Sequence, residues 1–256
     1  GEFQLCYQPK VHQDGEIESL EALLRWQSAE LGPISPNEFI PIAERSGLIH
    51  AISDHVVETA CAQLRQWLDR FGRAWPVAIN LSGKDLQRED ISARIAGVCE
   101  RLNIPANLIQ IEITETGLSE NGELVAMHLH ALAQHGFAIG LDDFGTGYSS
   151  LAKLSEFPIS VIKIDRSFVS GIGHHERREQ IVRATLSLAQ VLDCIAVAEG
   201  VETREQLVFL IEHGCELFQG YLFAQPLSVK EVALLLEMNV QRVPGVGVNS
   251  LIDFDD

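Results

Sequence analysis

The stretch FAIGLDDFG, from Phe137 to Gly145, joins a short apolar run to two adjacent carboxylates, Asp142 and Asp143. Two such carboxylates repel each other unless a cation lies between them. An ordinary alternative is a helix N-cap ahead of Gly145. Four more strand-like runs carry a carboxylate or amide in the same manner: Glu21 in LEALLRW, Asn80 in VAINLS, Glu112 in IQIEIT and Glu199 in AVAEGV. Any one of them alone is equally well explained by a solvated face or a salt bridge. Their repetition predicts an oxygen-lined metal site at one end of a barrel.

Apolar runs of this kind alternate with longer stretches of helical periodicity along the whole chain. The pattern predicts strands at residues 4–10, 20–26, 76–81, 108–114, 137–142, 161–164, 195–198 and 217–221. It predicts helices at residues 52–71, 90–102, 123–135, 179–192, 205–213 and 229–237. Eight strands alternating with helices favour a closed barrel over an open sheet. The predicted fold class is therefore α/β, a TIM-like (β/α) barrel.

The first two strands depart from this regular pattern. Asp14-Gly15 lies between them and leaves no room for a crossover helix, which is a hairpin signal. The sequence therefore predicts one antiparallel strand near the N-terminus of an otherwise parallel barrel. Several helix ends are also marked: Ser53-Asp54 near a start, Ser228 as an N-cap, and Gly136 and Gly214 just past C-termini.

Length and composition indicate one domain. The 256 residues are 46% hydrophobic and can bury one sizeable core without disulfides. We expect the domain to cover residues 1–241, with its first helix truncated, and residues 242–256 to form a tail or linker that contains Pro and Gly and ends acidic. Because the chain enters strand-like sequence within a few residues of Gly1, we expect it to be part of a longer polypeptide.

The cysteines and the net charge restrict the cellular location of the protein and the kinds of molecule that it can bind. Five scattered cysteines without a C-x-x-C spacing predict reduced thiols, hence a cytoplasmic domain, although the parent protein could be membrane-anchored. The formal net charge of −17 disfavours duplex DNA or RNA as a partner. A small phosphorylated ligand stays possible if divalent metals neutralise the site.

The predicted chemistry lies at the carboxyl ends of the strands, where barrel enzymes build their sites. In LIQIEIT, Glu112 shares one strand face with Gln110 and Thr114 and can point into the barrel. Oxygen ligands favour Mg²⁺ or Mn²⁺ over zinc, and two such ions would clamp a phosphodiester. Lys163 in VIKID would place an ammonium beside this centre, unless it is a surface lysine. Glu199 could receive the proton of the attacking water.

Two other features carry less weight. The paired histidines His174-His175 lie in a polar loop, and His128 and His130 face different ways on a helix, so a histidine metal site is disfavoured. Gly145-Thr146-Gly147 resembles a phosphate cradle but lacks the lysine and spacing of a P-loop. A flexible functional loop is the safer interpretation.

Taken together, these residues make the chain similar to the EAL-domain phosphodiesterases, which open cyclic di-GMP to linear pGpG. The resemblance covers nearly the whole chain. It rests on YQPK from Tyr7, Glu21-Ala22-Leu23 followed by LRW, NLS from Asn80, EITE from Glu112, DDFGTGYSSL from Asp142, IKID from Ile162, EGVE from Glu199 and QGYLFAQP from Gln219. It implies a TIM-like barrel with an antiparallel strand, in agreement with the hairpin.

The resemblance also implies residue roles. Metal ligands would be Glu21, Asn80, Glu112, Asp142 and Asp143, with one aspartate bridging two Mg²⁺ or Mn²⁺ ions. Lys163 and Glu199 would orient water and act as general base, and Gln219 would help to hold water or metal. Substrate contacts would be Gln8, Leu23 and Arg25, the last suited to fork onto a phosphate. Glu115 and Glu202 would support the ligands, Glu202 by anchoring the loop 143–150.

The same resemblance leaves alternatives open. Many family members have lost catalysis and act as cyclic di-GMP receptors that signal to an attached domain, and a protein-binding scaffold is a third possibility. Because every position expected to be essential keeps its residue type, the sequence favours an active enzyme. A homodimer through the barrel and an attached regulatory or GGDEF-type domain in the parent are further expectations.

Overall fold

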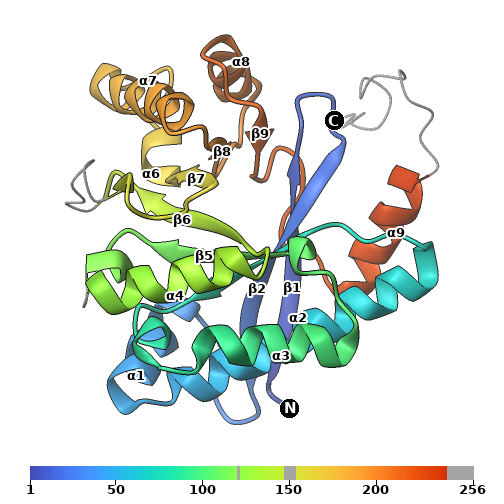
Figure 1. The fold of residues 1–256 in the computed structure, drawn as a ribbon. Coiled ribbons are helices and arrows are strands. Elements are labelled where there is room, and N and C mark those ends of the chain that lie inside the picture. Colours follow the sequence, from blue (N-terminus) through green and yellow to red (C-terminus); the bar gives the residue numbers. More distant parts are fainter. Residues whose placement is uncertain (120–121, 147–153, 241–256) are drawn as a thin grey trace.

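The structure is a computed structural model that describes residues 1–119, 122–146 and 154–240. Its strands form one sheet in the order β1-β9-β8-β7-β6-β5-β4-β2-β3, and β1 also pairs with β2. That last pairing closes eight strands into a barrel and leaves β3 outside it, paired only with β2. Helices surround the strands on the outside (Figure 1). The predicted α/β barrel is confirmed.

The strands agree closely with those predicted. They are β1 Phe3–Val11, β2 Ile17–Ser28, β3 Gly32–Ile34, β4 Val77–Leu81, β5 Ile109–Thr114, β6 Ala138–Phe144, β7 Val161–Ile164, β8 Ile195–Ala198 and β9 Leu217–Phe218. Only β3 was not predicted, because Gly32–Ile34 is too short to show any alternation. β9 is shorter than the predicted 217–221, since the chain turns at Gly220 against the backbone of Val201.

The predicted antiparallel strand is β1. It runs antiparallel to both of its neighbours, β2 and β9, whereas every other adjacent pair within the barrel is parallel. Gly15 adopts a φ of 76° in the connecting turn, and its N–H donates to the carbonyl of His12 at 2.8 Å. Glycine tolerates this left-handed conformation without steric cost. The Asp14-Gly15 hairpin is confirmed.

The described helices are α1 Pro36–Ser46, α2 Ile49–Phe71, α3 Ile91–Leu102, α4 Gly122–Gln134, α6 Arg166–Val169, α7 Glu176–Val191, α8 Arg204–Glu212 and α9 Val229–Val240. Neither α1 nor α6 was predicted. Pro36 and Pro41 of α1 weaken its helical signal, although Pro36 occupies the first turn, where proline is tolerated. α6 is a single turn that Asp165 caps by accepting from Ser167 N–H.

Two of the three predictions about helix ends are confirmed. Gly136 and Gly214 follow α4 and α8 with φ values of 93° and 84°, and Ser228 exchanges hydrogen bonds with Glu231 at the start of α9. The prediction that Ser53-Asp54 marks a helix start is wrong. α2 begins at Ile49 because it follows α1 almost directly, and Ser53 inside it donates to Asp85 Oδ2 at 2.6 Å.

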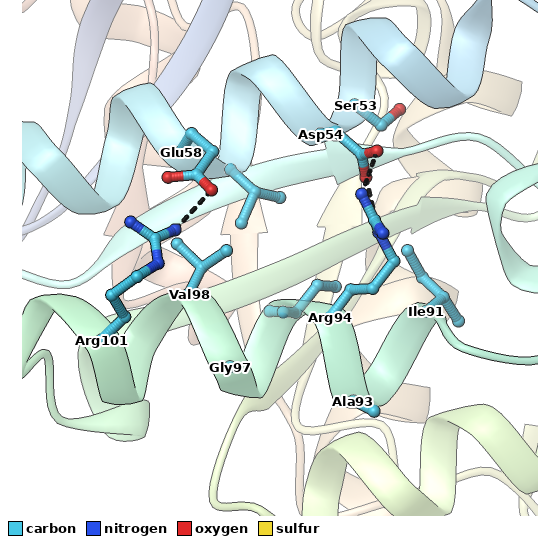
Figure 2. A pocket seen from close by; sticks show the side chains of 11 residues that line it. Ser53, Asp54, Glu58, Ile91, Ala93, Arg94, Gly97, Val98 and Arg101 are labelled. Atoms are coloured by element: carbon cyan, nitrogen blue, oxygen red, sulfur yellow. Dashed lines mark hydrogen bonds and ion pairs between the residues drawn. The ribbon is translucent and has the colours of Figure 1, made fainter.

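The outer faces of the strands pack against the helices. Tyr7 on β1 meets Trp67 of α2 edge to face, and both are buried with Trp75 in one apolar core. A groove between α2 and α3 lies on the outside of this layer (Figure 2). Ion pairs join its two helices, from Arg94 to Asp54 at 2.6 Å and from Arg101 to Glu58 at 2.5 Å. None of the predicted site residues lines this groove.

Candidate metal centre

Strand register brings the predicted site residues to one end of the barrel. Asn80 on β4 lies beside Glu112 on β5, and Thr114 lies beside Asp142 on β6. Glu199 follows β8 and Gln219 follows β9, and their backbone N–H groups donate to Ile164 and Ala198 of the preceding strands. Because the parallel strands end at the same edge, their last inward-facing side chains converge there.

Two groups of carboxylates result, and they share one member. Glu21, Glu112 and Asp142 place one oxygen each within 4.8 Å of one another, and so do Asp142, Asp143 and Glu199. The structure thus brings these acidic residues together, and their role as metal ligands stays a prediction. Asp142 therefore belongs to both groups, and each group could hold a metal ion.

Lys163 lies at the centre of both groups. Its Nζ is 2.6 Å from Glu199, 2.8 Å from Glu112, 3.1 Å from Asp142 and 3.3 Å from Glu21, and the side chain is 1% exposed. The alternative of a surface lysine is excluded. Burial lowers the pKa of a lysine, but the surrounding carboxylates outweigh burial and hold the pKa of Lys163 well above its ordinary value.

Glu21 is held by amides on both oxygens. Gln219 Nε2 donates to Oε2 and Asn80 Nδ2 donates to Oε1, each at 2.7 Å. Burial would raise the pKa of Glu21, but Lys163, Lys10 and these two amides lower it to about 2. Glu21 therefore stays ionised at any physiological pH.

The other acidic groups hold protons more firmly. Burial raises the pKa of Glu112 despite Lys10 and Lys163, and burial with the Asp142 charge raises the pKa of Asp143 to about 6. Burial also raises the pKa of Glu199 to about 8, against the opposing effect of Lys163. This site therefore has an excess of negative charge that protons or cations must neutralise.

The donor set fits hard divalent cations. Carboxylates dominate it, and the buried Oε1 of Gln219 has no hydrogen-bond partner in the part of the chain that the structure describes. A buried carbonyl oxygen without a partner costs free energy unless a cation or water uses it. Oxygen ligands of this kind suit Mg²⁺ or Mn²⁺.

A backbone turn presents Asp142 and Asp143 together. Asp143 adopts a φ of 54°, and its N–H donates to Asp142 Oδ1 at 2.8 Å. Glu115 supports this turn, because its N–H donates to the carbonyl of Asp142 and its Oε2 accepts from Gly145 N–H at 3.1 Å. No helix begins within residues 138–146, so the N-cap alternative for the two aspartates fails.

The residues predicted to contact a substrate lie beside this centre. Leu23 and Arg25 alternate with Glu21 on one face of β2 and line a cavity of about 260 Å³ together with Asn80. Arg25 donates to the carbonyl of Leu24 and makes no ion pair with a described residue. Gln8 is buried and already bonded, because its Nε2 donates to Ala224 O and its Oε1 accepts from Gln219.

Two predictions concern residues 147–150, which lie outside the described part of the chain. The described partners of Glu202 are Arg166, at 2.7 Å, and the side chain of Gln206. Whether Glu202 also anchors the loop 143–150 stays a prediction. In the segment Gly145-Thr146-Gly147, which we interpreted as a functional loop, Thr146 donates to the carbonyl of Asp143, and Gly147 lies outside the described residues.

Lys10 is a site residue that sequence reasoning missed. It is buried on β1 and pairs with Glu112. Gln110, on the same face of β5, also donates to Glu112 at 2.9 Å. The signal was present, because Gln8 and Lys10 alternate on one face of the predicted strand 4–10, but a single lysine at a strand end is usually solvated.

Comparisons with known proteins agree on one family. A model described as the EAL domain matches residues 1–226. The chain is 42% identical over 221 residues to the cyclic di-GMP phosphodiesterase PdeR of Escherichia coli, covering 86% of this chain and 33% of PdeR. It is 37% identical over 229 residues to the bifunctional diguanylate cyclase/cyclic di-GMP phosphodiesterase MucR of Pseudomonas aeruginosa, covering 89% and 33%. The chain thus spans about a third of these relatives.

Solved structures agree with the sequences. The phosphodiesterase of PaMucR in complex with c-di-GMP has a TM-score of 0.86 at 37% identity, covering 90% of this chain and 94% of that one. The EAL domain of Mycobacterium smegmatis DcpA has a TM-score of 0.80 at 32% identity, covering 94% and 100%.

Proposed function

The chain belongs to the EAL domain family, and on that premise we propose that it is a metal-dependent phosphodiesterase that hydrolyses cyclic di-GMP to linear pGpG. One observation carries the proposal: two carboxylate groups share Asp142 and surround Lys163.

The roles of the side chains follow from their chemistry. Glu21, Asn80, Glu112, Asp142 and Asp143 would hold two divalent ions, which when bound activate water and neutralise the charge of the departing oxygen. In the net reaction, the oxygen of one water bonds to phosphorus and the bond from phosphorus to the 3′ oxygen breaks. Gln219 would help to orient the water through Oε1, which has no hydrogen-bond partner among the described residues.

Proton transfer falls to Glu199 and Lys163. Glu199 is 2.6 Å from Lys163, and its pKa of about 8 suits a group that takes a proton from water near neutral pH. The 3′ oxygen gains a proton as it leaves. The reaction therefore consumes one water, and the total charge is the same before and after it. The ammonium of Lys163 would orient the attacking water and stabilise Glu199 when it is ionised.

Substrate binding falls to the cavity beside the carboxylates. Leu23 offers an apolar contact, and the guanidinium of Arg25, which makes no ion pair with a described residue, would fork onto a phosphate. Gln8 would contribute through its position next to Gln219. Glu115 and Glu202 would keep the aspartate turn and the loop after it in place.

The proposal also covers the identity of the metal ions, the oligomeric state and the longer parent protein. Mg²⁺ or Mn²⁺ would serve as the ions, and two copies would associate through the barrel. The parent protein would carry a regulatory or GGDEF-type domain, as the bifunctional name of MucR suggests, and would place this domain in the cytoplasm. Within the described residues, no helix has the length and apolarity of a membrane span. Sedimentation analysis of the purified chain tests the dimer.

The decisive experiment is incubation of the purified chain with cyclic di-GMP and Mg²⁺ or Mn²⁺, followed by chromatography of the products. Formation of pGpG that EDTA and Glu21→Ala both abolish is the expected result. Intact cyclic di-GMP in the presence of either ion, with binding still measurable, would replace the enzyme with a receptor module.

A further inference from the structure

Lys10 is a cation built into the barrel beneath the candidate metal centre. In the β1–β2 register, Gln8 lies opposite Glu21 and Lys10 lies opposite Ser19, one inward-facing layer deeper. Lys10 is 1% exposed and pairs with Glu112, which is 0% exposed. Lys10 therefore approaches the carboxylates from the side away from the barrel mouth.

The contacts of Lys10 are narrower than those of Lys163. Among the described residues, the only ion pair of Lys10 is with Glu112 Oε1, whereas Lys163 reaches four carboxylates. Gln110 Nε2 donates to the same oxygen of Glu112 at 2.9 Å, and Lys163 donates to the other oxygen at 2.8 Å. Glu112 thus has three donors, and of the two charged ones only Lys10 makes no ion pair with another described carboxylate.

Because Glu112 has two other donors, the charge of Lys10 can be removed without releasing the carboxylate from its position. If the ammonium of Lys10 were removed, Gln110 and Lys163 would still hold one carboxylate oxygen each. The lost positive charge would leave the centre more negative by one unit. A divalent cation beside Glu112 would then be attracted more strongly, because charges interact strongly in a buried site.

We propose that Lys10 is a positioning residue that acts as an internal counter-charge to Glu112 and competes with a divalent ion for that carboxylate. This inference rests on the proposed function, since it assumes that Glu112 serves a metal. Its consequence is that Lys10 stabilises the metal-free barrel and weakens metal binding, so that the ion can exchange.

The test compares the wild-type chain with Lys10→Met, which keeps an unbranched side chain one atom shorter and removes the charge. Mn²⁺ binding is measured by isothermal titration calorimetry, and Tm is measured with EDTA and with Mn²⁺. We expect Lys10→Met to bind Mn²⁺ at least about tenfold more tightly, to have a lower Tm in EDTA, and to gain more Tm from Mn²⁺ than the wild type.

Lys230→Met is the matched control. It removes the same charge from an exposed position on α9 and should leave the Kd for Mn²⁺ unchanged. Lys10→Gln is the second variant, because it keeps a polar hydrogen-bond donor in the side chain without a charge, and it should also bind Mn²⁺ more tightly. If Lys10→Met is unfolded in EDTA, the proposal requires Mn²⁺ to restore its folding, and failure of that rescue overturns it.

The outcomes distinguish this inference from the proposed function. Equal or weaker Mn²⁺ binding by both Lys10 variants, beside normal binding by the wild type, overturns the counter-charge role and leaves the hydrolase intact. A wild-type chain that binds neither Mn²⁺ nor Mg²⁺ overturns both. A lower Tm without any change in Kd would show that Lys10 is only structural.

Discussion

Glu199 combines a partly buried carboxylate with a direct ion pair to Lys163. Replacement by Gln keeps its shape and still accepts a hydrogen bond from Lys163, so the fold should survive. The amide cannot take a proton from water, and we expect kcat to fall by about 10²-fold or more. Steady-state hydrolysis of cyclic di-GMP measures this change, and circular dichroism checks the fold.

Glu21→Ala should lower turnover by a similar order, because it removes a carboxylate that Gln219 and Asn80 hold in place. Wild-type rates in either variant would mean that these carboxylates do not serve the reaction.

Gly140 supplies space beside Glu112 on the neighbouring strand. A Cβ at this position would lie 2.7 Å from Gln110 Nε2 and 3.2 Å from Glu112 Cγ. Gly140→Ala should therefore push Gln110 off the carboxylate, weaken Mn²⁺ binding about tenfold by disordering a metal ligand, and destabilise the fold by about 1–3 kcal/mol. Calorimetric titration with Mn²⁺ and denaturant unfolding measure the two effects.

Gly97→Ala is the control for that substitution. Gly97 lies in α3, and an added Cβ would meet no atom within 4 Å. It should raise stability by about 0.5–1 kcal/mol through helix propensity alone and leave metal binding unchanged. Equal behaviour of the two variants would show that the space at Gly140 is not needed.

Some of the site residues could be predicted from the sequence, and others could not. Acidic residues after apolar runs could be placed in one site because parallel strands end together. Lys10 could not, because its partner is 102 positions away and its burial depends on barrel closure. Likewise, the bonds of Gln8 to Ala224 and Gln219 depend on contacts that no local pattern encodes.

Among the elements, the turn after β9 carries Gln219 into the site. A Cβ at Gly220 would lie 2.1 Å from the carbonyl oxygen of Val201, a backbone atom that cannot move aside. The segments are also joined by hydrogen bonds from Val201 N–H to Gln219 O and from Leu222 N–H to Val201 O, each at 3.0 Å. The close approach of these two turns fixes the position of Gln219.

Gly220→Ala should separate the two turns and destabilise the fold by at least about 2 kcal/mol. Gln219 would lose its contact with Glu21, so hydrolysis should also fall at temperatures where the variant is folded. Urea unfolding and activity at low temperature measure both effects. Gly122→Ala, whose Cβ would meet no described atom within 4 Å, should leave the hydrolysis rate unchanged and should not lower stability. A Gly220→Ala chain as stable as wild type would contradict this account.

Helices and strands with a long hydrophobic pattern were predicted correctly. Prediction failed for elements whose existence or start depends on tertiary contacts. The eight barrel strands were predicted, whereas β3 and α6 contain only three and four residues. The start of α2 was misplaced because Ser53, a typical capping residue, bonds instead to the buried Asp85 on a neighbouring turn.

For the whole molecule, the raised pKa values predict how the stability of the metal-free chain depends on pH. The pKa of Asp143 is about 6 and that of Glu199 about 8 in the folded chain, above their ordinary values. At pH 5 the unfolded chain has released most of these protons, whereas the folded chain releases that of Asp143 only near pH 6 and that of Glu199 only near pH 8. Stability is therefore lost as the pH rises through this range.

We expect the Tm in EDTA to fall from pH 5 to pH 8, by an amount corresponding to on the order of 1 kcal/mol or more. The depressed pKa of Glu21, about 2, acts only at the acid end, where stability falls as the pH drops below about 4. Thermal scans across pH measure the profile. Glu199→Gln should show a smaller fall between pH 5 and 8, and an identical slope in both chains would refute the assignment.

Closure of the barrel joins the two ends of the described chain. Tyr7 and Leu227 exchange two backbone hydrogen bonds of 2.8 Å, and Val11 pairs with Phe218. During synthesis, β1 must wait with one edge unpaired until these late residues leave the ribosome, roughly 10–40 s at ordinary elongation rates. Such an edge is prone to pair with other chains. Nascent polypeptides that stop short of Phe218 should therefore depend on chaperones and lack activity, since Gln219 reaches Glu21 only after the last strand has docked.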